Sequence, residues 1–157
     1  MEWVQSGLEH GGYFTLALLS FLSAVFPVIS AELAVVGVGA GMSNANLLLL
    51  VLAATIGQML GKSAMYWLGR RGSALAQGRY AEAMEKWGHR FRGSSKSVNG
   101  LVFLSSASGL PPFYVISTLA GAFRTSFVAF LLVGTAGRAL RFAAVGMFPM
   151  AFKTFQG

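Results

Sequence analysis

The sequence predicts an all-α integral membrane protein, built as an inverted repeat of two re-entrant helical hairpins that are each followed by a transmembrane helix. Three observations support this fold class: a scarcity of charge, apolar segments broken by proline, and an internal repeat. The chain has 157 residues, of which 11% are charged and 55% hydrophobic, whereas a typical soluble domain is about 25% charged. Too few charged side chains are present to cover a water-exposed surface. We therefore treat residues 1–157 as a single membrane domain.

The first half-repeat covers about residues 11–69. Its apolar region, 12–42, is interrupted by Pro27 and Glu32, and proline blocks helix continuation because it removes a backbone donor. We expect a hairpin here with its tip near Pro27. A transmembrane helix near 46–69 follows, and it exceeds the roughly 20 apolar residues that a bilayer requires.

A basic stretch, residues 70–96, separates the two halves. It holds seven of the twelve Lys and Arg residues of the chain and only two acids, Glu82 and Glu85. An excess of positive charge between apolar segments is typical of a cytoplasmic loop, and it favours contact with anionic lipid headgroups. The stretch carries no nucleic-acid-binding motif, so we expect no nucleic-acid partner.

The second half-repeat covers about residues 97–152. Pro111 and Pro112 divide its first apolar segment, 97–123, into two pieces. The longer piece, of about 13 residues, would rise only about 20 Å as a helix, which is too short to span a bilayer. We expect a second hairpin with its tip at these prolines, where irregular backbone must be buried in protein or line water. The final apolar region, near 124–152, predicts the second transmembrane helix.

An internal repeat relates the two halves. Shifting the chain by 80 residues aligns eight identical positions, including Ala40-Gly41 with Ala120-Gly121 and Thr55-x-Gly57 with Thr135-x-Gly137. If 70–96 is cytoplasmic, the two transmembrane helices run in opposite directions, which is a recurrent plan in transporters. A straight arrangement of four spans, near 11–31, 46–68, 98–122 and 125–152, remains open. So does the question whether 12–42 is re-entrant or fully spanning.

Three charged residues in the apolar segments are the candidates for function. Glu32 is the only acid inside an apolar segment, and an intramembrane carboxylate is a candidate proton carrier or ligand for a cationic group. Arg138 and Arg141 lie at i and i+3, on one helix face. Because arginine keeps its charge, both must face a cavity, a carboxylate or a phosphate. Pairing with Glu32 would offset their burial. The alternative for all three is that they reach the membrane interface.

Polar side chains also mark the first transmembrane helix. Gln58, Lys62 and Tyr66 recur at i, i+4 and i+8 and form one stripe, and Asn44 and Asn46 precede the helix as capping residues. We expect Asn44 and the stripe to line the site, although Lys62 could instead extend to the interface. The pairs Gly57-x-x-x-Gly61 and Gly134-x-x-Gly137 predict close helix contacts. No catalytic set or metal-ligand spacing is present, so we expect neither an enzyme nor a cofactor.

The motifs resemble those of the DedA superfamily, which shares the VTT or SNARE-associated Golgi protein domain, and most closely its short YqaA-like branch. The resemblance spans roughly residues 20–147. In the first half it rests on Phe21-Leu22-Ser23-Ala24, Pro27, Ala31-Glu32, Ala54-Thr55-Ile56-Gly57-x-x-x-Gly61 and Tyr66-x-x-Gly69-Arg70. In the second half it rests on Gly109-Leu110-Pro111-Pro112, Leu119-Ala120-Gly121, Phe127 and Gly137-Arg138-x-x-Arg141-Phe142.

The resemblance implies two facing re-entrant hairpins in the bacterial inner membrane, and translocation of lipids or lipid carriers such as phospholipids or undecaprenyl phosphate. Proton coupling has been proposed for the family, and Glu32 matches its first-hairpin acid. Many members carry a basic residue before the second-hairpin proline, and some an acid after it. This chain departs from both patterns: Ser105, Ser106 and Ala107 precede the prolines, and Phe113 and Tyr114 follow them. Arg138 and Arg141 could supply the missing positive charge.

These observations predict a small inner-membrane transporter or lipid translocase with Glu32, Arg138 and Arg141 at a midplane site. We expect membrane lipids as partners, in particular an anionic phospholipid or a polyprenyl phosphate, with protons as a candidate coupling ion. A homodimer is compatible with so short a chain. The alternative function is a non-transporting structural or lipid-organising membrane protein whose buried charges only hold the hairpins together.

Overall fold

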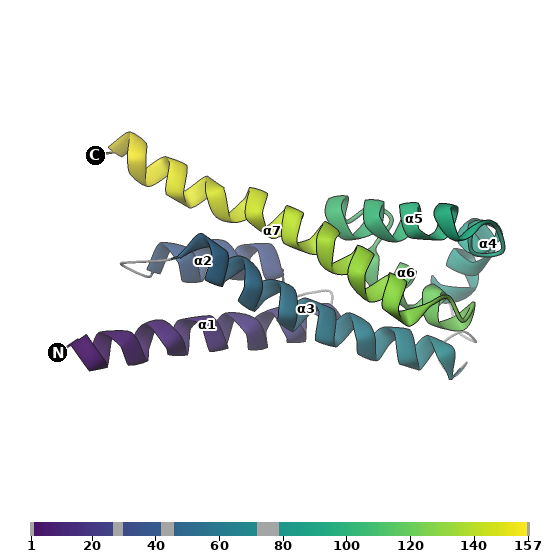
Figure 1. The fold of residues 1–157 in the computed structure, drawn as a ribbon, viewed down its shortest axis with the longest axis horizontal. Coiled ribbons are helices and arrows are strands. Elements are labelled where there is room, and N and C mark those ends of the chain that lie inside the picture. The colour runs from purple at the N-terminus through teal and green to yellow at the C-terminus, as the bar shows by residue number, and fades with distance from the viewer. Residues whose placement is uncertain (1, 27–29, 42–45, 72–78, 157) are drawn as a thin grey trace.

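A computed structural model describes residues 2–26, 30–41, 46–71 and 79–156 of the chain, and side-chain surroundings for 11–26, 30–41, 46–71, 82 and 85–147. Over these ranges the protein is helical and contains no strand, so the all-α prediction is confirmed. Its helices, shown in Figure 1, are α1 (Glu2–Val25), α2 (Ala31–Gly41), α3 (Leu47–Arg70), α4 (Arg79–Phe91), α5 (Ser95–Ser108), α6 (Phe113–Ala122) and α7 (Phe127–Gln156).

Both apolar segments that proline interrupts are divided between two helices. The first breaks between α1 and α2, and its predicted tip residue, Pro27, lies outside the described residues. The second breaks between α5 and α6, where Gly109 ends α5 with a φ of +81° and Pro112 precedes the first residue of α6. Neither 11–31 nor 98–122 is therefore one continuous helix, as the arrangement of four straight spans would require.

Among the residues that the structure describes, two helices are long and apolar enough to cross a membrane: α3, and residues Phe127–Met147 of α7. Large apolar side chains are exposed on both, among them Leu52 and Leu60 on α3 and Leu132 on α7. Exposed leucines in such number are unfavourable in water but are expected where lipid covers the surface. Asn46 caps α3, accepting hydrogen bonds from the backbone N–H groups of Leu48 and Leu49, as predicted. Asn44 lies outside the described residues.

The basic stretch 70–96, which the sequence analysis assigns to a cytoplasmic loop between the half-repeats, contains the helix α4. The polar character of the stretch concealed an apolar face. Trp87 and Phe91, four residues apart, both pack with the core cluster around Phe113 and Phe130, since residues at i and i+4 share a helix face. Tertiary burial of this face explains how so polar a segment forms a helix at the end of the bundle.

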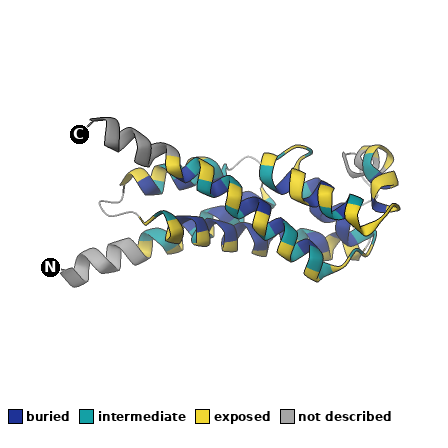
Figure 2. Cartoon of the chain, turned by 45° about the horizontal axis from the view of Figure 1, so that its top comes forward, coloured by how far each residue is buried: buried dark blue, intermediate teal, exposed yellow. Residues whose placement is uncertain are grey.

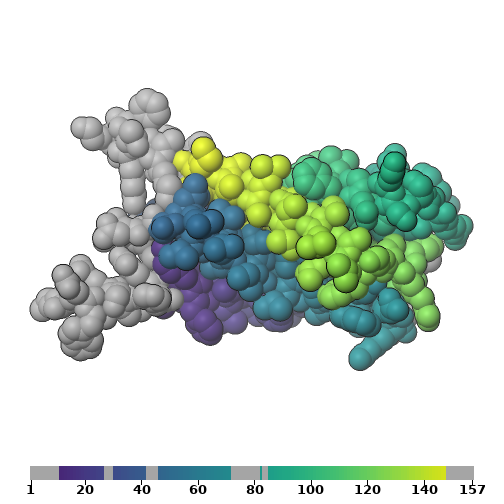
Figure 3. All heavy atoms as spheres, in the orientation of Figure 1, coloured from purple at the N-terminus to yellow at the C-terminus, as the bar shows by residue number. Residues whose placement is uncertain are grey.

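Glycines on the long helices allow neighbouring helices to approach closely. α3 contacts α1, α6 and α7, and α7 also contacts α2 and α5. Figure 2 shows buried residues facing the interior between the helices, and Figure 3 shows α7 lying across one face between α2 and α5. A Cβ atom at Gly57 would collide with the carbonyl of Ala17, and one at Gly137 with the side chain of Ser106. The predicted packing role of both glycines is confirmed.

The buried apolar side chains form two separate clusters along these helices. One gathers around Tyr66, Phe113 and Phe130, and the other around Leu16 and Phe142. On α7, Arg138 lies between Phe130 and Phe142 in sequence. Arg138, one of the predicted site residues, therefore lies on α7 between residues of the two apolar clusters.

Candidate functional site

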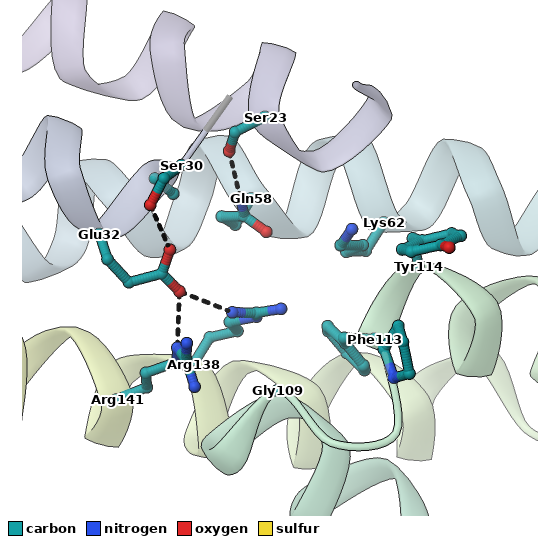
Figure 4. Close-up of a pocket in the computed structure, with 12 residues that line it drawn as sticks. Ser23, Ser30, Glu32, Gln58, Lys62, Gly109, Phe113, Tyr114, Arg138 and Arg141 are labelled. Carbon is teal, nitrogen blue, oxygen red and sulfur yellow. Dashed lines mark hydrogen bonds and ion pairs between the residues drawn. The ribbon is translucent and has the colours of Figure 1, made fainter. Parts of the chain in front are cut away.

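Glu32, Arg138 and Arg141 come together in the structure, although the acid and the two bases lie on different helices (Figure 4). Arg141 donates from Nε to Oε1 of Glu32 at 2.6 Å. The Nη1 atom of Arg138 lies 3.7 Å from the same oxygen. The predicted pairing of Glu32 with both arginines is confirmed, and it joins α2 to α7.

The start of α2 positions the carboxylate. Ser30 precedes this helix, and its hydroxyl accepts from the backbone N–H of Leu33 at 3.3 Å while donating to Oε2 of Glu32 at 3.0 Å. A carboxylate in the first turn also interacts favourably with the positive end of the helix dipole. Ser30 was not predicted as a site residue, although serine is a preferred residue at the position before a helix start.

The second break in the chain contacts the same ion cluster. Arg141 donates from Nη1 to the carbonyl oxygen of Ala107, near the end of α5, at 3.3 Å. Gly109 packs directly against the guanidinium, since a Cβ atom there would lie 3.1 Å from Nη1. A side chain at this position would both crowd Arg141 and strain the positive φ angle. Arg141 thus connects α2, α5 and α7.

Arg138 is buried with part of its donor capacity unused. Its relative exposure is 7%, and its guanidinium lies 4.9 Å from the centroid of the Phe113 ring, a favourable cation–π contact. Its Nε atom is buried and has no hydrogen-bond partner in the described part of the chain. A buried donor without a partner is costly, so an anion that reached this side chain would be stabilised.

Lys62 and Gln58 extend the polar surface along α3. Lys62 is 4% exposed and donates from Nζ to the carbonyl oxygen of Ala24 at 2.8 Å. Gln58 donates from Nε2 to the hydroxyl of Ser23. The interpretation of Lys62 as a residue that extends to the interface is therefore wrong: it points into the protein because α1 supplies an acceptor there.

Together these side chains line a cavity of about 270 Å³. Its walls come from both halves of the chain: Ser23, Ser30, Ala31, Glu32, Gln58, Lys62, Gly109, Pro112, Phe113, Tyr114, Arg138 and Arg141. Of the predicted hairpin-tip residues, Pro112 lines it, whereas Pro111 does not. Two arginines and a lysine face one carboxylate, and guanidinium groups bind phosphate and carboxylate through paired hydrogen bonds. The cavity is therefore suited to an anionic group.

Tyr66, the third member of the predicted stripe, does not line this cavity. Its side chain is fully buried beside Phe127 and Phe130, and its hydroxyl donates to the carbonyl oxygen of Thr125. The helical spacing correctly placed it on the face of Gln58 and Lys62. However, one turn further along α3, that face meets aromatic residues of α7.

Tyr66→Phe is expected to lower the free energy of unfolding by about 1 kcal/mol or more, because it removes the bond to Thr125 and the one that the hydroxyl accepts from Arg70 while keeping the ring. Tyr13→Phe, which removes a more exposed bond to the N–H of Asn46, should have a smaller effect. Thermal unfolding in detergent measures both. A change in ligand binding at the cavity, with stability unaltered, would contradict this placement of Tyr66.

Comparisons with known proteins point to one family. The family model for the VTT domain matches residues 33–148. No curated protein matches the chain, and neither does any solved structure. The match covers most of the chain, from within α2 through residue 148 of α7. It includes Arg138 and Arg141, and Glu32 lies immediately before it.

Proposed function

Because the chain belongs to the membrane-associated VTT domain family, we propose that it is a small transporter that translocates lipids or lipid carriers with a phosphate-bearing headgroup. The observation that carries this proposal is the cavity between the two halves, where Arg138, Arg141 and Lys62 face the single carboxylate of Glu32. A phosphate would supply acceptors for the unpartnered Nε atom of Arg138, and arginine is well suited to bind it.

The proposed architecture is an inverted repeat in the bacterial inner membrane, with α1–α2 and α5–α6 as re-entrant hairpins and residues 70–96 in the cytoplasm. The helix contacts support this repeat. α1 packs on α3 as α5 packs on α7, and α6 packs on α3 as α2 packs on α7. Transporters of this plan bind their substrate near the midplane, between the repeats, where broken helices end.

The proposed mechanism exchanges one partner of Arg141 for another. In the absence of substrate, the carboxylate of Glu32 holds Arg141 and Arg138. An entering phosphate takes over these guanidinium donors, and Glu32 takes up a proton in place of the lost ion pair. When the headgroup leaves on the other side of the membrane, Glu32 releases that proton and pairs with Arg141 again. Lipid movement would thereby be coupled to a proton gradient.

Reconstitution tests the proposal. In proteoliposomes, Arg141→Ala is expected to slow the movement of a fluorescent anionic phospholipid at least about tenfold, because a charge-assisted hydrogen bond contributes about 1.5–3 kcal/mol. Glu32→Gln should abolish the acceleration produced by an imposed pH gradient. Arg71→Ala is the matched control, since Arg71 is exposed at the end of α3 and does not line the cavity. Wild-type rates in both cavity variants would refute the proposal.

The second candidate is a non-transporting structural or lipid-organising membrane protein. It is favoured by the position of Arg141, which connects α2, α5 and α7 through Glu32 and Ala107. In this case the same substitutions lower thermal stability while wild-type proteoliposomes show no lipid movement above that of protein-free vesicles. The two candidates are therefore distinguished by the wild-type protein alone.

A further inference from the structure

A second cavity, of about 300 Å³, lies at the α4 end of the bundle. It is formed by the end of α4, the start of α5 and the turn between α6 and α7. Phe91, Val98 and Phe123 contribute apolar walls, and Asn99, Arg124 and Ser126 contribute polar ones. It shares no lining residue with the cavity around Glu32, so it is a separate site.

The arginines around this cavity have no acidic partner in the part of the chain that the structure describes. Arg124 lines it, is exposed, and makes no hydrogen bond or ion pair through its side chain within the described ranges. Arg92 lies with its guanidinium 5.7 Å from the ring centroid of Phe123, one of the apolar walls. The acids of this region, Glu82 and Glu85, are exposed and form no ion pair with any described residue. The local charge therefore favours an anion.

The position of the cavity favours a lipid headgroup over a free ion. α3 and α7, the two helices long enough to cross a membrane, end at Arg70 and begin at Phe127, on the same side as α4 (Figure 1). Trp67 and Trp87 also lie on this side, near the end of α3 and on α4, and tryptophan is enriched where the bilayer meets water. Apolar walls beside arginine side chains match a phosphate attached to a glycerol and acyl chains.

We propose that this cavity binds the headgroup of an anionic phospholipid, with Arg124 and Arg92 holding the phosphate above the apolar walls of Phe91, Val98 and Phe123. The bound lipid would anchor α4 and the α6–α7 turn to the membrane surface. The hydroxyl of Ser126 and the side-chain amide of Asn99, which also line the cavity, add further donors. This proposal does not depend on the proposed transport function.

Thermal unfolding of the full chain in detergent tests the site, with phosphatidylglycerol, phosphatidylcholine or inorganic phosphate added. Phosphatidylglycerol should raise the Tm of the wild-type protein, and the other two should not. Arg124→Asn removes the charge, and asparagine tolerates the positive φ of 52° at this position. About five times more phosphatidylglycerol should then be needed for the same rise in Tm, which is the contribution expected of one cation near an anionic surface.

Ala129→Met is a second variant, because it fills the cavity from α7 without a change in charge, and it should weaken the effect as well. Arg71→Gln, a loss of charge at the same end outside the cavity, should not. Each variant is also measured with Arg141→Ala present, so that lipid bound in the other cavity does not contribute. An unchanged response in Arg124→Asn and Ala129→Met overturns the proposal. The proposal is also overturned if Arg71→Gln loses as much of the phosphatidylglycerol effect on Tm, or if inorganic phosphate alone raises the Tm as much as the lipid does.

Discussion

Glu32→Gln is expected to lower the free energy of unfolding by about 2 kcal/mol, because removing one partner of a partly buried ion pair leaves uncompensated positive charge. Glu32 is the only acid lining its cavity, and Lys62, Arg138 and Arg141 all face that cavity. Lys62 and Arg138 are at most 7% exposed, so water can solvate little of the positive charge that the substitution leaves unpaired. Thermal unfolding of the purified protein in detergent gives the measurement.

Two variants serve as controls. Glu82→Gln removes an exposed acid on α4 and should leave stability within about 0.5 kcal/mol of the wild type. The double variant Glu32→Gln, Arg141→Gln should recover part of the loss, since it also removes one of the unpaired cations. A Glu32→Gln protein that unfolds like the wild type would mean that the ion pair does not stabilise the fold.

Gly121→Leu is expected to prevent α3 and α6 from packing, with a loss of about 3 kcal/mol or more, because extra atoms in a packed contact force the backbone apart. A Cβ atom at Gly121 would collide with the carbonyl of Tyr66, and one at Gly69 would collide with the carbonyl of Thr118. The two glycines therefore bring two backbones into direct contact, and neither backbone can rotate away as a side chain can.

Gly100→Ala on α5 is the matched control, since a Cβ atom at Gly100 meets nothing within 4 Å. It should be neutral or stabilise the protein by up to about 1 kcal/mol, the difference in helix propensity between glycine and alanine. The comparison uses the same thermal unfolding assay, together with the yield of monodisperse protein. Equal behaviour of Gly121→Leu and Gly100→Ala would contradict the close packing of α3 against α6.

The ion cluster was predictable because few charges occur in the apolar segments. Glu32, Arg138 and Arg141 need partners there, and the structure pairs them. The division of both interrupted segments into two helices was likewise predictable from Pro27 and the Pro111-Pro112 pair. The residues that support the ion cluster were not predicted as part of it. Ser30 donates to Glu32 from its hydroxyl, and Gly109 packs against the guanidinium of Arg141; the second contact depends on how the fold brings the end of α5 against α7.

Two features escaped the sequence analysis for a common reason. Tyr66 was assigned to the site by helical spacing, and no helix was predicted within the basic stretch 70–96. In both cases the outcome depended on aromatic residues elsewhere in the chain. Phe127 and Phe130 surround Tyr66, and Phe123 stacks on Phe91 at the end of α4. Such contacts cannot be read from the local pattern of either helix.

The membrane character of the chain, its apolar helices and the places where they break could all be predicted from the sequence. These properties depend on local hydrophobicity and on proline, which lacks a backbone donor. Which polar groups meet, in contrast, depends on how the helices pack. Arg141 and Glu32 are separated by 109 residues, and their contact, like the orientation of Lys62 toward Ala24, requires glycine-mediated packing of α3 and α7 against the other helices. A cavity exists only once both halves supply its walls.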